Sequence, residues 1–258
     1  MTAFQAYAEA PSAGQLGHLA ANLNGVNAAS TLVRAVDAAI ACGLAQCEGA
    51  TPGKTCKSPT TDALAKASIG VLLDPAYLNE IGTATTYTIL QPATLIEEGY
   101  LWVNAEGTVA VGDKVCVRHT SDGGSNVTPG TLTNVSDYAA GGIVLTPVAV
   151  VGSDSNHYSL TLFDGFVRKT YSFNSDITPT VAEVITGLVT LINADTPFDA
   201  VDGTTTIAIT SVTGILEIDH GAQFTAGNAT RCAPVPGWTW HSARTGAGLA
   251  KIRLRKQS

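Results

Sequence analysis

Short apolar runs that alternate with polar positions, separated by glycine turns, dominate the hydropathy pattern of this chain. Within Tyr100–Thr120 the runs Leu101–Val103 and Val115–Val117 lie on either side of a Val-Gly-Asp turn. Side chains alternate between two faces along a strand, so such runs predict strands. We interpret these two runs as the central hairpin of a barrel. Further strands are predicted within 68–74, 85–104 and 141–151, and their spacing predicts a mainly β fold with a barrel or sandwich core.

The pattern changes near Asp154. Asp164-Gly165 predicts a hairpin turn, and the spacing of apolar residues that follows predicts an amphipathic helix capped by Thr178 or Thr180. Two more strands around Thr213-Gly214 complete a ββαββ unit, about the size of a small α+β domain. The helix stripe comprises Val181, Val184, Ile185, Leu188, Leu191 and Ile192.

The pattern predicts three parts: an extended N-terminal arm at 1–30, a discontinuous β core at 31–154 and 223–258, and an inserted α+β domain at 155–222. Residues 31–49 are compatible with an Ala-rich helix or with two strands around Gly43. Residues 51–66, punctuated by two prolines and a glycine, are interpreted as a loop. In the last strand, alternation predicts that Ile252 and Leu254 point inward while Arg253 and Arg255 point outward.

Composition narrows the class of protein. Only 14% of residues are charged while 45% are hydrophobic, which argues against a disordered chain. The net charge of −7 argues against nucleic acid as the main partner. The longest mildly apolar run, Thr31–Leu44, contains Arg34 and Asp37 and is too short to cross a membrane. The N-terminus lacks a signal-peptide pattern, so we expect synthesis in a reducing cytoplasm.

No residue pattern points to a catalytic, cofactor or metal site. The five cysteines are odd in number and lack C-x-x-C spacing, so neither a zinc site nor a disulfide framework is predicted. The five histidines do not form H-x-H or H-E-x-x-H patterns. The stretch Thr120–Ser125 lacks the Lys-Ser/Thr end of a phosphate-binding loop, and no serine stands in a G-x-S-x-G context. We therefore expect a protein that is not an enzyme and needs no cofactor.

Three stretches carry a family resemblance: "GYLWVNAEGTVAVGDKVCVRHT", "GKTCKSPTTDALAKASIGVLLD" and the closing "ARTGAGLAKIRL". They resemble the strand patterns of tailed-phage structural cement proteins, which decorate capsids. The likeness covers about 2–151 and 231–254. The ββαββ unit is similar to a module inserted in other phage virion proteins, including tail-sheath proteins.

The resemblance implies a non-enzymatic virion protein on the capsid surface that binds the major capsid protein and stabilises the shell. An extended arm can add a strand to a neighbour's sheet, and a trimer would multiply contacts on a lattice with three-fold axes. Host-surface glycans are a further expected partner of the inserted domain, which would protrude. The expected contact residues are Phe4, Tyr7, His18, Leu19, Arg253 and Arg255.

The alternative is a tail-associated adhesin or a carbohydrate-binding β module. In that case exposed aromatic side chains would carry the binding, and Trp238 and Trp240 in "GWTW" are the candidates. Alternation along a strand places both on one face.

Overall fold

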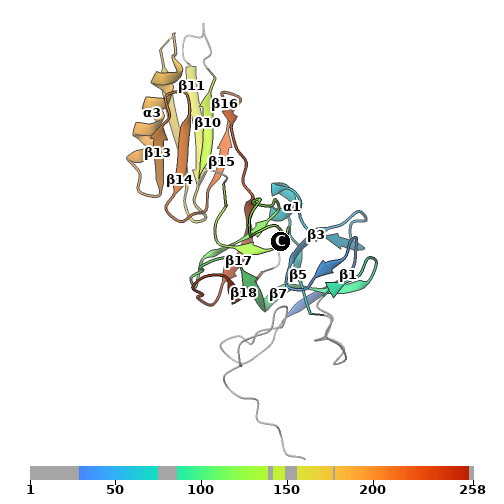
Figure 1. Cartoon of the computed structure of the whole chain (residues 1–258). Coiled ribbons are helices and arrows are strands. Elements are labelled where there is room, and N and C mark those ends of the chain that lie inside the picture. Colours follow the sequence, from blue (N-terminus) through green and yellow to red (C-terminus); the bar gives the residue numbers. More distant parts are fainter. Residues whose placement is uncertain (1–28, 75–85, 139–141, 149–155, 177, 256–258) are drawn as a thin grey trace, which may run out of the picture. The chain divides into compact units, whose positions relative to one another are not determined.

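The computed structural model describes residues 29–74, 86–138, 142–148, 156–176 and 178–255 (Figure 1). It is mainly β, as predicted, and the chain divides into two compact units. The first unit comprises 1–58, 69–113 and 237–258; the second comprises 59–68 and 114–236. Within the described residues, no helix is both long enough and apolar enough to span a bilayer.

Five strands of the first unit hydrogen-bond in a ring. Their order is β1–β4–β3–β5–β7, and β7 pairs again with β1. Side chains from these strands and from β6 form a buried cluster that includes Val36, Leu72, Tyr87 and Leu95. The strands of this unit are β1 (Ser30–Val36), β2 (Ile40–Ala41), β3 (Ala45–Glu48), β4 (Thr55–Lys57), β5 (Gly70–Leu72), β6 (Thr86–Tyr87), β7 (Pro92–Ala105), the end of β17 (Cys232–Trp240) and β18 (Gly248–Leu254).

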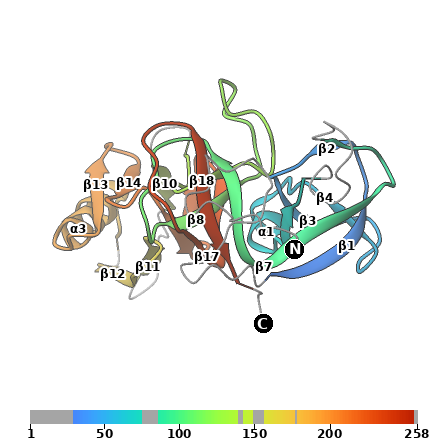
Figure 2. The ribbon, with the colours of Figure 1, turned by 90° about the horizontal axis from the view of Figure 1, so that it is seen from below.

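The long strand β7 serves two sets of partners. Its first half, from Pro92 to Glu98, pairs with β1, and its second half, from Gly99 to Ala105, pairs with β18. Figure 2 shows green β7 running from blue β1 to red β18. Gly99, between the two halves, has φ 128°, a backbone conformation that residues with a Cβ rarely adopt.

The structure decides one open alternative and corrects one interpretation in this unit. Of the two alternatives for residues 31–49, it shows strands around Gly43, whose φ is 74°, and not an Ala-rich helix. The predicted hairpin of Leu101–Val103 with Val115–Val117 is wrong: β7 pairs with β1, β5 and β18, whereas β8 (Lys114–Arg118) pairs with β9 (Leu132–Thr133). Strand partners depend on contacts far apart in sequence, which a local pattern does not encode.

The second unit packs helix α3 against two sheets. One sheet has the order β13-β14-β10-β16 and the other β12-β11-β15. Figure 1 shows α3 alongside β13, and α3 also contacts β12. The further elements are α1 (Asp62–Lys66), β10 (Ile143–Pro147), β11 (Asn156–Phe163), β12 (Arg168–Ser175), α3 (Val181–Asn193), β13 (Phe198–Asp202), β14 (Ile207–Ser211), β15 (Glu217–His220) and β16 (Phe224–Ala226).

Helix α3 begins where the sequence predicts. The Thr180 hydroxyl accepts a hydrogen bond from the Glu183 N–H at 3.1 Å, satisfying a donor that the first turn leaves without a partner. Four residues of the predicted stripe, Val184, Ile185, Leu188 and Ile192, are fully buried, whereas Leu191 is 40% exposed.

The core of the second unit extends beyond the predicted domain 155–222. It includes Ile143, Leu145 and Phe224, which lie on β10 and β16. The strands on either side of Thr213-Gly214 belong to different sheets, because β14 pairs with β10 and β13 while β15 pairs with β11. The insertion with the boundaries 155 and 222 therefore stays a prediction.

The interpretation of residues 51–66 as a loop is wrong in part. Thr55–Lys57 forms β4, and Asp62–Lys66 forms α1, whose first turn is capped by the Thr61 hydroxyl accepting from the Leu64 N–H. Lys66 bonds both Asp62 and Glu217, so this helix is tied to β15 of the same unit.

Gly70 offers a direct test of the ring packing. A Cβ at this position would lie 2.7 Å from the Ile96 carbonyl oxygen, a backbone atom that cannot rotate away. We expect Gly70→Ala to lower the free energy of unfolding by about 1–3 kcal/mol, since overpacking forces backbone shifts. The matched control is Gly107→Ala, where a Cβ would meet nothing within 4 Å. There a neutral or slightly stabilising change is expected, because alanine restricts the unfolded chain. Equal melting temperatures for the two variants would contradict the packing.

Candidate functional site

Of the predicted contact residues, the structure describes two. Phe4, Tyr7, His18 and Leu19 lie outside the described residues. Arg253 lies on β18 and Arg255 directly follows it. Along this strand Ile252 and Leu254 are at most 1% exposed, whereas Arg253 is half-buried and Arg255 is exposed, so the predicted orientation is confirmed.

Arg253 and Arg255 belong to a sheet face that gathers cationic and aromatic side chains. Register pairs Arg253 with Tyr100 on β7 and with Thr239 on β17, and it pairs Lys251 with Trp102. Neighbours across an antiparallel sheet point to the same side. We call this set the basic-aromatic face; it comprises Tyr100, Trp102, His241, Lys251, Arg253 and Arg255.

Contacts within the face keep its side chains in place. The Lys251 Nζ lies 5.5 Å from the centre of the Trp102 ring, a cation–π contact, and the rings of Tyr100 and His241 are 4.7 Å apart at 58°. On the opposite side of the same strands, Leu101, Val103 and Ile252 are fully buried. Because those residues pack in the core, the outer face is supported on a rigid sheet.

The electrostatics of the face are opposite in sign to those of the chain. Three cationic side chains, Lys251, Arg253 and Arg255, lie together in a protein of net charge −7. Burial, followed by the neighbouring cations Lys251 and Arg253, lowers the pKa of His241, which favours its neutral imidazole form. Such a face can bind the carboxylate groups of a partner protein, together with aromatic rings or backbone groups next to those carboxylates.

The aromatic pair that the carbohydrate-binding alternative requires is in the core. Trp238 and Trp240 on β17 do share one face, as alternation predicts, but each is only 1% exposed. A ring that stacks on a sugar must be accessible to it, so these two tryptophans do not form the predicted binding site.

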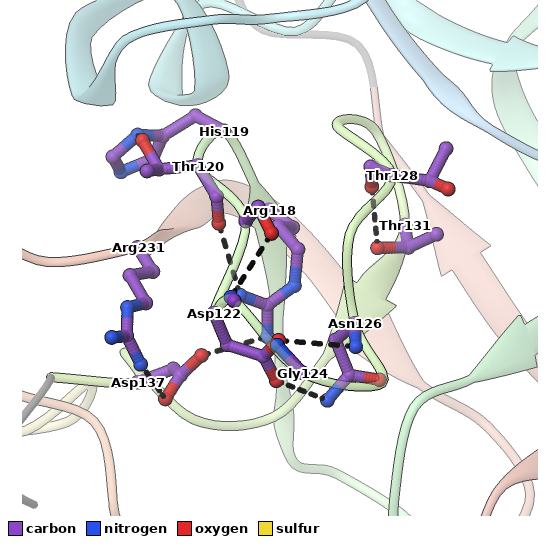
Figure 3. Close-up of polar contacts among 12 residues, drawn as sticks. Arg118, His119, Thr120, Asp122, Gly124, Asn126, Thr128, Thr131, Asp137 and Arg231 are labelled. Atoms are coloured by element: carbon purple, nitrogen blue, oxygen red, sulfur yellow. Dashed lines mark hydrogen bonds and ion pairs between the residues drawn. The ribbon is translucent and has the colours of Figure 1, made fainter.

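A second polar cluster surrounds the buried guanidinium of Arg118, at the end of β8 (Figure 3). Its Nη2 lies 2.8 Å from Asp137 Oδ2, and its Nη1 donates to the Thr120 carbonyl oxygen at 3.1 Å. Arg231 Nη1 lies 3.7 Å from the other oxygen of Asp137. The carboxylate of Asp137 thus joins two arginines that are distant in sequence.

The cluster anchors a loop that continues from β8 to β9. The loop is closed at its base by the Arg118 N–H donating to the Thr131 carbonyl and by the Gly130 N–H donating to the Arg118 carbonyl. Asp122 Oδ1 accepts from the Gly124 and Asn126 N–H groups, at 2.7 and 3.2 Å. These bonds lower the pKa of Asp122 below its ordinary value, the bond from Gly124 contributing most. The cluster therefore orders the loop between β8 and β9.

The cysteines are also in environments that make their thiols unreactive. All five are free and buried. Burial, with a smaller contribution from nearby carboxylates, raises the pKa of Cys42 and of Cys56 to about 11, so both remain protonated thiols at neutral pH. In the described part of the chain, no group of three or more His, Cys, Asp or Glu residues is placed to hold a metal ion.

Sequence reasoning named Arg253 and Arg255 as contact residues but did not place Tyr100, Trp102 and His241 beside them. The alternation within β7 places Tyr100 and Trp102 on one face, yet only the strand pairing brings them to β18. It also missed the Arg118–Asp137 pair, which no local pattern indicates.

Comparison with known families finds a match that covers much of the chain. A family model described as structural cement protein (E217 gp24/Pam3 gp6) matches residues 4–164, which is more than half of the 258 residues. The matched region contains Tyr100, Trp102 and Arg118, and it ends in the turn between β11 and β12. No curated protein matches the chain.

Proposed function

Because the chain belongs to the family of phage structural cement proteins, we propose that it binds the outer surface of capsomers through its basic-aromatic face. The family implies a structural, capsid-stabilising protein of the virion and suggests a non-enzymatic role. The observation that supports the face as the contact is its concentration of three cations and three aromatic rings on one rigid sheet of an acidic protein.

The proposed partner is an acidic patch of the major capsid protein. Modest contacts at each site suffice, since a capsid presents many copies at fixed spacing. Electrostatic complementarity would set the orientation of docking and speed the encounter. The rings of Tyr100 and Trp102 would supply apolar contact area beside the charges.

Two further elements of the proposal concern assembly. The arm 1–30, with Phe4, Tyr7, His18 and Leu19, would lie along a neighbouring subunit, and the protein would bind as a trimer at a three-fold axis of the lattice. Binding of nucleic acid or membrane is not part of the proposed function, and contact of the predicted inserted domain, 155–222, with host glycans stays a prediction.

Charge reversal tests the face. We expect Arg253→Glu combined with Arg255→Glu to weaken binding to capsids that lack the protein by about tenfold or more at low salt. The loss should shrink as salt rises from 0.1 to 1 M, because the screening length falls from about 10 to about 3 Å. Occupancy is measured by co-sedimentation with capsids over a protein titration.

The matched control is Lys54→Glu combined with Arg168→Glu, which changes the net charge equally at two exposed positions outside the face. Binding by this control should stay close to that of the unchanged protein. Equal losses in both double variants would mean that net charge, and not the face, decides binding. No loss in either would overturn the assignment of the face.

A further inference from the structure

The turn between β6 and β7 presents two large aliphatic side chains to solvent. Ile89 and Leu90 are 62% and 70% exposed. They are the central residues of a four-residue turn, which the Gln91 N–H closes by donating to the Thr88 carbonyl oxygen at 3.0 Å. No residue from Thr86 to Pro92 carries a charge. The tip of the turn is therefore apolar and uncharged.

The residue at the third position of this turn does not suit the backbone there. Leu90 has φ 63°, in the left-handed region. A turn with positive φ at its third position favours glycine or asparagine, because a Cβ with a bulky substituent crowds the backbone. Leucine gains little from burial at 70% exposure, so neither the backbone nor packing explains its presence. Residues held in such conformations cluster at functional sites.

The turn is held firmly on the ring of strands. The Leu90 N–H donates to the Val36 carbonyl at 2.8 Å, and the Val36 N–H donates to the Gln91 carbonyl at 3.1 Å. Just before the turn, Tyr87 is 1% exposed, and its hydroxyl donates to the Leu73 carbonyl at 2.9 Å. Because these bonds fix the backbone on both sides, Ile89 and Leu90 form a preorganised protrusion. Its backbone is already ordered before binding, so little conformational entropy is lost when it binds.

We propose that Ile89 and Leu90 form an apolar anchor that inserts into an uncharged, apolar pocket of the major capsid protein. This inference rests on the proposed function and adds a second contact to the basic-aromatic face. Two aliphatic side chains bury far less than the roughly 1,000 Å² of a stable protein interface, so they are too small to hold two copies of this chain together alone. On a capsid they act beside other contacts, where a small apolar anchor adds to the total.

Leu90→Asn separates this role from a structural one, because the two predict opposite signs. Asparagine tolerates positive φ, so the variant should melt at the same temperature as the unchanged protein or up to about 2–4 °C higher. Its affinity for capsids should fall by about tenfold, the loss expected when a buried leucine contact is removed. A residue that served only the fold would lower the melting temperature and leave binding unchanged.

Val111→Asn is the matched control. Val111 is 64% exposed in another turn of the same unit, and it is absent from the residues with positive φ. We expect this variant to bind capsids normally. Unchanged capsid affinity of Leu90→Asn, or an equal loss in both variants, would overturn the anchor.

Two comparisons separate the anchor from its premise. If charge reversal of Arg253 and Arg255 has no effect while Leu90→Asn binds weakly, the proposed role of the basic-aromatic face is wrong and that of the apolar anchor is supported. If the unchanged protein does not bind capsids, the proposed function and the anchor both fail. Sedimentation velocity of Leu90→Asn identifies the other occupant: an oligomer that dissociates while capsid binding is retained would mean that the turn contacts a second copy of this chain.

Discussion

Replacing Asp137 with asparagine is expected to lower the free energy of unfolding by about 2–3 kcal/mol. The change leaves the guanidinium of Arg118, which is 1% exposed, without its carboxylate partner at 2.8 Å. Breaking a buried ion pair from one side typically costs about 3–5 kcal/mol, and the 24% exposure of the Asp137 side chain places this pair below that range. Asp137 has φ 47°, in the left-handed region that asparagine tolerates, so the substitution adds no backbone strain.

Thermal unfolding measures this effect, with an expected fall in melting temperature of roughly 4–10 °C. The control is Asp199→Asn on β13, an exposed aspartate, for which a change within about 0.5 kcal/mol is expected. If both variants melt alike, the Arg118 cluster contributes nothing to stability and the loop from β8 to β9 has another anchor.

The second large effect is expected at Leu254, on the buried side of β18. Truncation of a fully buried leucine to alanine costs about 2–5 kcal/mol, from lost burial together with the cavity left behind. Total stability of a domain is about 5–15 kcal/mol, so Leu254→Ala should melt clearly earlier than the unchanged protein. Its neighbour supplies the comparison: Arg253→Ala should melt almost normally, because half-exposed charges contribute little to folding.

The two variants also differ in binding. Arg253→Ala should bind capsids less well at low salt while keeping its melting temperature. Leu254→Ala, studied below its melting temperature, should bind nearly as well as the unchanged protein, since the basic-aromatic face remains. A large melting loss for Arg253→Ala with none for Leu254→Ala would contradict the orientation of the strand.

Local chemistry made part of this fold predictable. The Thr180 cap and the apolar stripe of α3 act within one or two turns, and the alternation of β18 follows from a two-residue period. Helix α1 was not predicted from the sequence. It lies just after Pro59, at the end of a turn-rich stretch, and its five residues are too few to show the hydrophobic periodicity of a helix.

The site was predictable only in part, because its residues come from strands far apart in sequence. Alternation shows that Trp238 and Trp240 share a face but not which face is buried; the neighbouring strands decide that. Likewise Arg253 and Arg255 could be placed outside, whereas the approach of Tyr100 and Trp102 depends on β7 pairing with β18 instead of with β8. The pairing of Arg118 with Asp137 depends on how the segment after β9 returns to β8.

The five buried thiols have a consequence for durability. A virion component passes from the reducing interior of a cell into air-saturated water, where exposed thiolates oxidise or form mixed disulfides. Burial raises the pKa of Cys42 and Cys56 to about 11, which keeps both thiols protonated at pH 7, and it also shields them from oxidants. Burial thus favours the reduced form of the free cysteines in the core, because it limits both their ionisation and their access to oxidants.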